Sequence, residues 1–65
     1  MKVREVIRIL EIDGWRVDRQ RGSHRQFRHA HKRGTVTIAG KPGDDLKAGT
    51  LASIFRQAGI ERDKR

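Results

Sequence analysis

The fold of this chain is decided by the stretch WRVDRQRGSHRQFRH, residues 15–29. Its second half, from His24 to His29, contains one large apolar side chain, Phe27, with polar residues on both sides. Side chains alternate between the two faces of a strand, so Phe27 sets the face that points into the core. Three residues are then expected to point outward: His24, Gln26 and Arg28.

The first half of the stretch has the same period of two. Trp15, Val17 and Arg19 alternate with Arg16, Asp18 and Gln20. This pattern predicts a strand that carries the first three side chains on its inner face and the other three on its outer face. Between the two halves, Arg21-Gly22-Ser23 supplies a tight turn, because glycine adopts the backbone conformations that such turns need. The two strands therefore form a hairpin.

A third strand and a helix are predicted on either side of this hairpin. Thr35–Ala39 alternates cleanly, which extends the hairpin to a three-stranded antiparallel meander. Its threonines, Thr35 and Thr37, take the outer face. Before the hairpin, apolar side chains at helical spacing predict a helix from Lys2 to Asp13 that Gly14 closes.

A second helix is predicted after the sheet, beyond the break at residues 40–43. Leu51, Ile54, Phe55 and Ala58 form its apolar stripe, and Gly59 ends it. Asp44 and Asp45 are placed at its start, where negative charge is favourable. The fold class is thus α+β in the order α-β-β-β-α, with both helices on one face of the sheet and the other face polar and open. Double-stranded RNA-binding domains have this order too.

Length and composition limit what this chain can be. The 65 residues are interpreted as one domain over residues 1–61, with residues 62–65 as a frayed basic tail. The sequence has no cysteine, no apolar run of membrane-spanning length and no secretory signal, so a cytoplasmic location without membrane contact is expected.

The charge of the chain points to a polyanionic partner. Sixteen Lys and Arg against 8 Asp and Glu give a net charge of +8. Most of the cations are arginines, whose planar guanidinium pairs bidentately with phosphate. RNA on the open polar face of the sheet is therefore the expected partner, and no small-molecule cofactor is expected.

Other kinds of site fit the sequence less well. Zinc needs three or four converging ligands, and His29 and His31 are the only pair expected to share a face. Asp44 and Asp45 are adjacent carboxylates that point apart, unlike a magnesium site. Trp15 and Phe27 lie on the inner face, so we interpret them as core residues and not as base-stacking residues.

The turn and the residue after it carry the chemical hypothesis. RNA supplies its own nucleophile, the 2′-hydroxyl, so its cleavage requires a proton acceptor, a proton donor and positive charge, without a metal. His24 is the candidate proton acceptor, positioned by Gly22 and Ser23, while Arg21, Arg25 or Arg28 would steady the transition-state charge. A solvated strand histidine in a non-catalytic RNA-binding module is the alternative.

The residues also resemble a known family. Gly14-Trp15, residues 19–27 (RQRGSHRQF), residues 36–38 (VTI), Gly49-Thr50-Leu51 and residues 56–60 (RQAGI) are similar to the HicA (YcfA-like) toxins. The resemblance implies an mRNA interferase of a toxin–antitoxin pair, with His24 of the Gly-Ser-His motif as catalytic residue. It also implies a HicB-type antitoxin that binds the toxin and masks this histidine. A decayed toxin that retains antitoxin binding is a further alternative.

Two positions depart from the pattern of that family. Many members carry proline after the second histidine and another histidine just after the third strand, where this chain has Ala30 and Lys41. Lys41 is counted among the candidate phosphate-binding residues. The general acid is left open between water, Ser23 and a group polarised by a cation.

Overall fold

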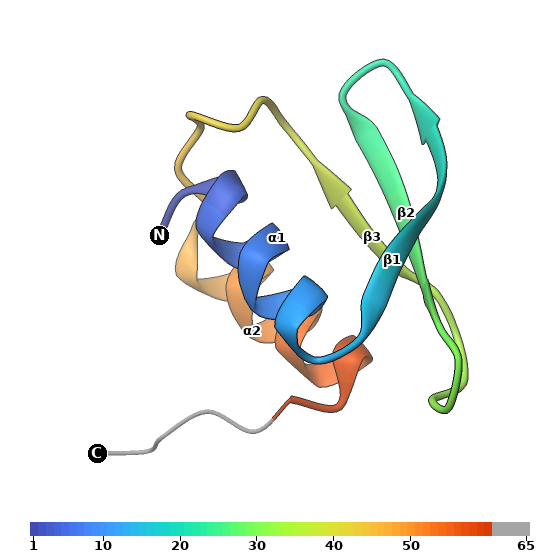
Figure 1. The fold of residues 1–65 in the computed structure, drawn as a ribbon. Coiled ribbons are helices and arrows are strands. Elements are labelled where there is room, and N and C mark those ends of the chain that lie inside the picture. Colours follow the sequence, from blue (N-terminus) through green and yellow to red (C-terminus); the bar gives the residue numbers. More distant parts are fainter. Residues whose placement is uncertain (61–65) are drawn as a thin grey trace.

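A computed structural model describes residues 1–60 of the chain and confirms the α-β-β-β-α order (Figure 1). Helix α1 (Val3–Ile12) is followed by strands β1 (Trp15–Arg21), β2 (His24–His29) and β3 (Val36–Ala39) and by helix α2 (Ala48–Ala58). The strands form one antiparallel sheet in the order β1-β2-β3, and both helices cover the same face of it. The tail predicted at residues 62–65 lies outside the described residues.

The core fills the space between the helices and the covered face of the sheet. Trp15 and Phe27 are both fully buried there, as predicted. Burying two large aromatic side chains matters in so short a chain, since each contributes about 1.5–3 kcal/mol. The remaining buried apolar residues are Val3, Val6, Leu10, Val36, Ile38, Leu51, Ile54, Phe55 and Ala58.

Strand β1 departs from the predicted alternation because it contains a β-bulge. Val17 pairs with Phe27, but the next pair joins Arg19 to Gln26, so Asp18 is an extra residue in the strand. An extra residue inverts the phase of everything after it. The prediction that Arg19 faces inward and Gln20 outward was therefore wrong.

Val17 takes the inner face of the sheet as predicted, but the helices do not bury it. Val17 pairs with Phe27 and lies on the covered face, yet 45% of it remains exposed. The turn end of the β1–β2 hairpin extends beyond the helices (Figure 1), and β1 lies at the edge of the sheet. The helices thus leave this part of the covered face open.

Asp44 and Asp45 do not start the second helix, contrary to the prediction. Helix α2 begins at Ala48, with Lys47 as its N-cap and no acidic residue in its first turn. The segment around the two aspartates instead covers the N-terminus of α1, where the backbone N–H of Val3 donates to the carbonyl oxygen of Asp44 at 2.9 Å. The Lys2 Nζ also lies 3.2 Å from Asp45 Oδ1. The orphan N–H groups of α1, rather than those of α2, thus find their partners here.

Candidate functional site

The open face of the sheet has a hollow at the turn end of the hairpin. Arg21 pairs with His24 across the strands, and Arg19 pairs with Gln26. Side chains of directly opposed residues share one face of a sheet. These four residues line the hollow, whose volume is ≈ 270 Å³. An imidazole, two guanidinium groups and an amide are thereby brought together.

The imidazole of His24 is available to a ligand. His24 is exposed at the first position of β2, on the face opposite to the buried Phe27. Within residues 1–60, its ring makes no hydrogen bond or ion pair. Gly22 holds the preceding turn with φ +59°, a conformation that glycine adopts without strain. The turn therefore sets the direction of His24 while leaving its ring nitrogens free.

The sequence-predicted cationic residues take different places. Arg21 lies beside His24 in the hollow. Arg25 lies on the covered face, where it is half-buried and its Nη1 donates to the carbonyl oxygen of Gly40 at 3.1 Å. Arg28 is on the open face, four residues along β2 from His24, or about 13 Å at the rise of a strand.

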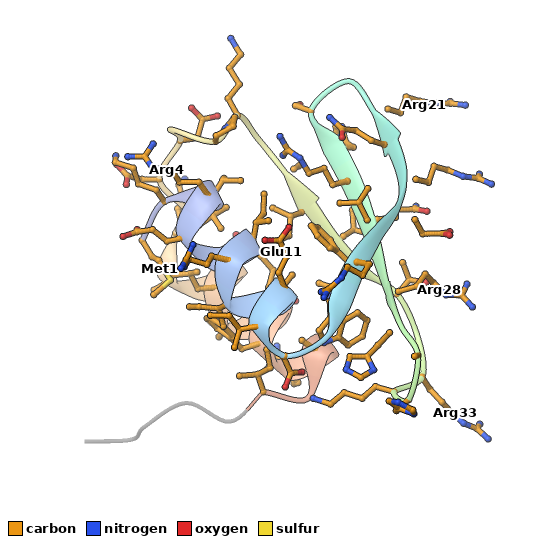
Figure 2. All side chains as sticks on the ribbon, in the orientation of Figure 1. Met1, Arg4, Glu11, Arg21, Arg28 and Arg33 are labelled. Carbon is orange, nitrogen blue, oxygen red and sulfur yellow. The ribbon has the colours of Figure 1, made fainter. Side chains whose placement is uncertain are left out.

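Two further candidates lie near the turn without lining the hollow. Ser23 is exposed, and its carbonyl oxygen accepts from the N–H of Gly40 at 3.1 Å. Lys41 follows Gly40 and is exposed, so the residue lies at the same end of the sheet as the hairpin turn. Figure 2 shows Arg21, Arg28 and Arg33 all projecting away from the helices. Positive charge therefore extends along the open side of the molecule beyond the hollow itself.

Two residues of the hollow were missed by the sequence reasoning as site residues. Arg19 was assigned to the inner face, and Gln26 was placed outward without a role. The assignment of Arg19 to the inner face was energetically unfavourable, because its guanidinium would have been buried without a counter-charge. That conflict is the signal by which the bulge at Asp18 could have been found.

The other end of β2 holds a second histidine in a very different setting. His29 Nε2 lies 2.7 Å from the carbonyl oxygen of Asp13, and its Nδ1 accepts the backbone N–H groups of His31 at 2.9 Å and Lys32 at 3.1 Å. Because Nδ1 accepts these two hydrogen bonds, it carries no proton. Nε2 therefore carries the ring proton and donates it to the carbonyl oxygen of Asp13. The ring also packs edge-on against Trp15, with centroids 5.2 Å apart. His29 is thus fully engaged in holding the fold together.

Asp13 belongs to the same cluster. Its Oδ2 accepts from the Lys32 Nζ at 2.6 Å and from the indole Nε1 of Trp15 at 3.1 Å. The hydrogen bond from Lys32 lowers the pKa of the Asp13 carboxyl below its ordinary value of 3.8, although partial burial acts in the opposite direction. The Lys32 Nζ also donates to the carbonyl oxygen of Ala58 at 3.1 Å. The cluster therefore ties α1, β2 and the end of α2 together.

The described part of the chain contains neither a cluster of metal ligands nor a membrane-spanning helix. Residues 1–60 contain no group of three or more His, Cys, Asp or Glu side chains arranged to hold a metal ion. No helix within these residues is long and apolar enough to cross a membrane.

Comparison with known proteins places the chain in relation to a family. The family model described as HicA toxin of bacterial toxin-antitoxin matches residues 3–60, which is nearly the whole chain. No curated protein matches significantly. The matched range includes both helices, the whole sheet and all four residues of the hollow.

Proposed function

The chain belongs to the HicA toxin family of toxin–antitoxin systems, and on this premise we propose that it is an mRNA interferase. It cleaves mRNA without a metal ion, and the resulting loss of translation arrests growth. Its place of action is the cytoplasm, where mRNA is exposed. His24 is its catalytic residue.

The proposed reaction uses the 2′-hydroxyl of the substrate as nucleophile. His24 accepts the proton of that hydroxyl as the 2′-oxygen attacks phosphorus. The bond from phosphorus to the 5′-oxygen breaks, which leaves a 2′,3′-cyclic phosphate on one fragment and a 5′-hydroxyl on the other. The leaving oxygen takes its proton from water, from the Ser23 hydroxyl or from a group polarised by a nearby cation. Negative charge grows on the phosphoryl oxygens in between, where a guanidinium stabilises it.

One observation supports this proposal most strongly. The hollow joins the free imidazole of His24 to the guanidinium groups of Arg19 and Arg21, and no acidic side chain among residues 1–60 lines it. A proton acceptor and positive charge are two of the three requirements of this reaction, the third being a proton donor. A purely structural histidine would be satisfied from within the fold, as His29 is.

The family also implies an antitoxin partner. We propose that a HicB-type antitoxin with acidic side chains covers the hollow and masks His24. The 65-residue chain has a net charge of +8, and its like-charged side chains repel one another. A partner that binds the folded state and neutralises this charge therefore stabilises the toxin.

The test of the proposed function is the variant His24→Ala. We expect RNA cleavage to fall by about 10²- to 10⁴-fold, since this is the usual contribution of one acid–base residue. Growth arrest should disappear while the variant folds and binds RNA. His31→Ala is the matched control, because His31 is also exposed, lies outside the hollow and keeps its backbone N–H bond to His29, losing an edge contact between the two rings.

Two results would contradict the proposal. Full toxicity of stably expressed His24→Ala would exclude a catalytic His24. Loss of wild-type cleavage on addition of EDTA would overturn the metal-independent reaction.

A further inference from the structure

The hollow contains a cation that the sequence alone assigned to the core. We propose that Arg19 and Arg21 together form the binding site for the scissile phosphate of the RNA, with Arg19 contacting the phosphoryl oxygens directly. This inference rests on the proposed function and adds a second catalytic residue to His24.

The β-bulge is what brings Arg19 to the site. Trp15 faces the core, and in a regular strand Arg19, four residues later, would face the core too. Asp18 is the extra residue that reverses the phase, so Arg19 pairs with Gln26 and Arg21 with His24 on the open face. Bulges beside active sites commonly redirect a side chain in this way.

The guanidinium groups of the hairpin fall into two classes. Arg16 Nη1 donates to the carbonyl oxygens of Glu11 at 2.9 Å and Trp15 at 2.8 Å, and Arg25 Nη1 donates to Gly40. Arg19, Arg21 and Arg28, by contrast, make no hydrogen bond or ion pair within residues 1–60. Of these three guanidinium groups, those of Arg19 and Arg21 line the hollow and are available to a ligand there.

The spacing of these two free arginines suits one phosphate group. Residues two apart on the same face of a strand are separated by about 6.5–7 Å, and residues paired across strands by about 5 Å. A phosphate placed between Arg19 and Arg21 therefore also lies within reach of His24. Each guanidinium offers parallel N–H donors that match two phosphoryl oxygens.

The first experiment measures binding alone. Its probe is a fully 2′-O-methylated RNA oligonucleotide, which lacks the nucleophilic hydroxyl and is not cleaved. We expect Arg19→Ala to weaken binding about tenfold, as the loss of a charge-assisted contact does. The slope of log affinity against log salt should fall by roughly 0.7, the value for one phosphate contact on a single strand. Arg8→Ala removes the same charge from the exposed surface of α1 and should leave the slope unchanged.

The second experiment measures cleavage of unmodified RNA at saturating concentration. We expect Arg19→Ala to lower the rate by about 10²-fold, since one lost donor to a developing negative charge costs that much or more. Arg19→Lys should recover the salt slope but only part of the rate, because a lysine keeps the charge and loses the planar fork.

The outcomes separate this inference from the proposed function. If wild type cleaves RNA and Arg19→Ala matches Arg8→Ala in both slope and rate, the phosphate site is wrong and the function stands. If wild type binds but never cleaves, the function is wrong, and the difference in salt slope between the two variants still decides whether Arg19 contacts phosphate.

Discussion

Strand β2 begins and ends with a histidine, and the two imidazole rings differ in burial and in hydrogen bonding. At the turn end, His24 is exposed and its ring has no partner within the described residues. At the other end, both ring nitrogens of His29 are hydrogen-bonded and the ring packs on Trp15. The fold thus leaves one histidine ring of this strand unsatisfied, and this is the ring of the proposed catalytic residue, whereas it satisfies the other ring completely and uses it for stability.

The position of the helices explains this difference. They cover the sheet at the His29 end, whereas the hairpin turn extends beyond them (Figure 1). Around His29, chain segments from α1 and from the loop after β2 converge and supply partners. Around His24, the neighbouring strands supply no hydrogen-bond partner for the ring within the described residues. The bulge places the two arginines of the hollow on the same face. The proposed catalytic residue thus lies at the end of the hairpin that extends beyond the helices (Figure 1).

The largest effect on stability should come from replacing His29. In His29→Ala, the carbonyl of Asp13 and the N–H groups of His31 and Lys32 lose their partner, and Trp15 loses an edge contact. We expect a loss of roughly 2–4 kcal/mol in the free energy of unfolding, which is a large share of the stability of so small a domain. Urea denaturation measures this value.

His24→Ala is the counterpart at the other end of the strand. It removes no internal contact, so the free energy of unfolding should change by less than about 0.5 kcal/mol. Equal destabilisation by the two variants would show that His24 also holds the fold, and the contrast between the two ends would fail.

Gly14 offers a smaller effect on the same end of the molecule. A Cβ at Gly14 would lie 2.7 Å from His29 Nε2, and the residue has φ +106°. Gly14→Ala therefore forces the imidazole away from Asp13 and strains the backbone. We expect a loss of about 1–2 kcal/mol.

Gly49→Ala is the matched control for this substitution. Gly49 lies in α2, and a Cβ there meets nothing within 4 Å. Alanine in a helix is favoured over glycine by up to about 1 kcal/mol, so this variant should be stabilised. A stabilised Gly14→Ala would mean that the position of the His29 ring does not depend on this close approach. Thermal unfolding of both variants provides the comparison.

The sequence predicted the fold and part of the site, for reasons that can be traced to single residues. Phe27 gave the correct phase for β2 because that strand is regular, and His24, Gln26 and Arg28 followed from it. Gly22 marked the turn because its positive φ is rare for other residues. Strand periodicity and turn residues depend on neighbouring positions in the chain, so they can be predicted from the sequence alone.

Other features depended on contacts between distant segments. The bulge at Asp18 arises when the strands pair, and the sequence indicates it only indirectly, through the cost of placing Arg19 on the inner face. Asp44 and Asp45 looked like the start of a helix, but their segment covers α1, more than 40 residues earlier in the chain. One partner of His29, the carbonyl oxygen of Asp13, likewise lies 16 residues away in the sequence. Such non-local partners can be known only from the folded chain.

The smallest effect concerns the ion pair between Asp13 and Lys32 at the His29 end. Because the pKa of Asp13 is lowered in the folded state, the carboxylate stabilises the fold above its ordinary value of 3.8, and this stabilisation is lost as the pH falls through the lower folded value. The difference in free energy of unfolding between wild type and Lys32→Met should therefore be larger at pH 6 than at pH 3. The pH-dependent part should be at most about 1 kcal/mol, since both side chains are about one-third exposed, at 33% and 35%.

The hydrogen bond from Lys32 to Ala58 adds a part that does not vary with pH. In an Asp13→Asn background the effect of Lys32→Met should become independent of pH, and a difference that stayed pH-dependent there would assign the linkage to another carboxyl group.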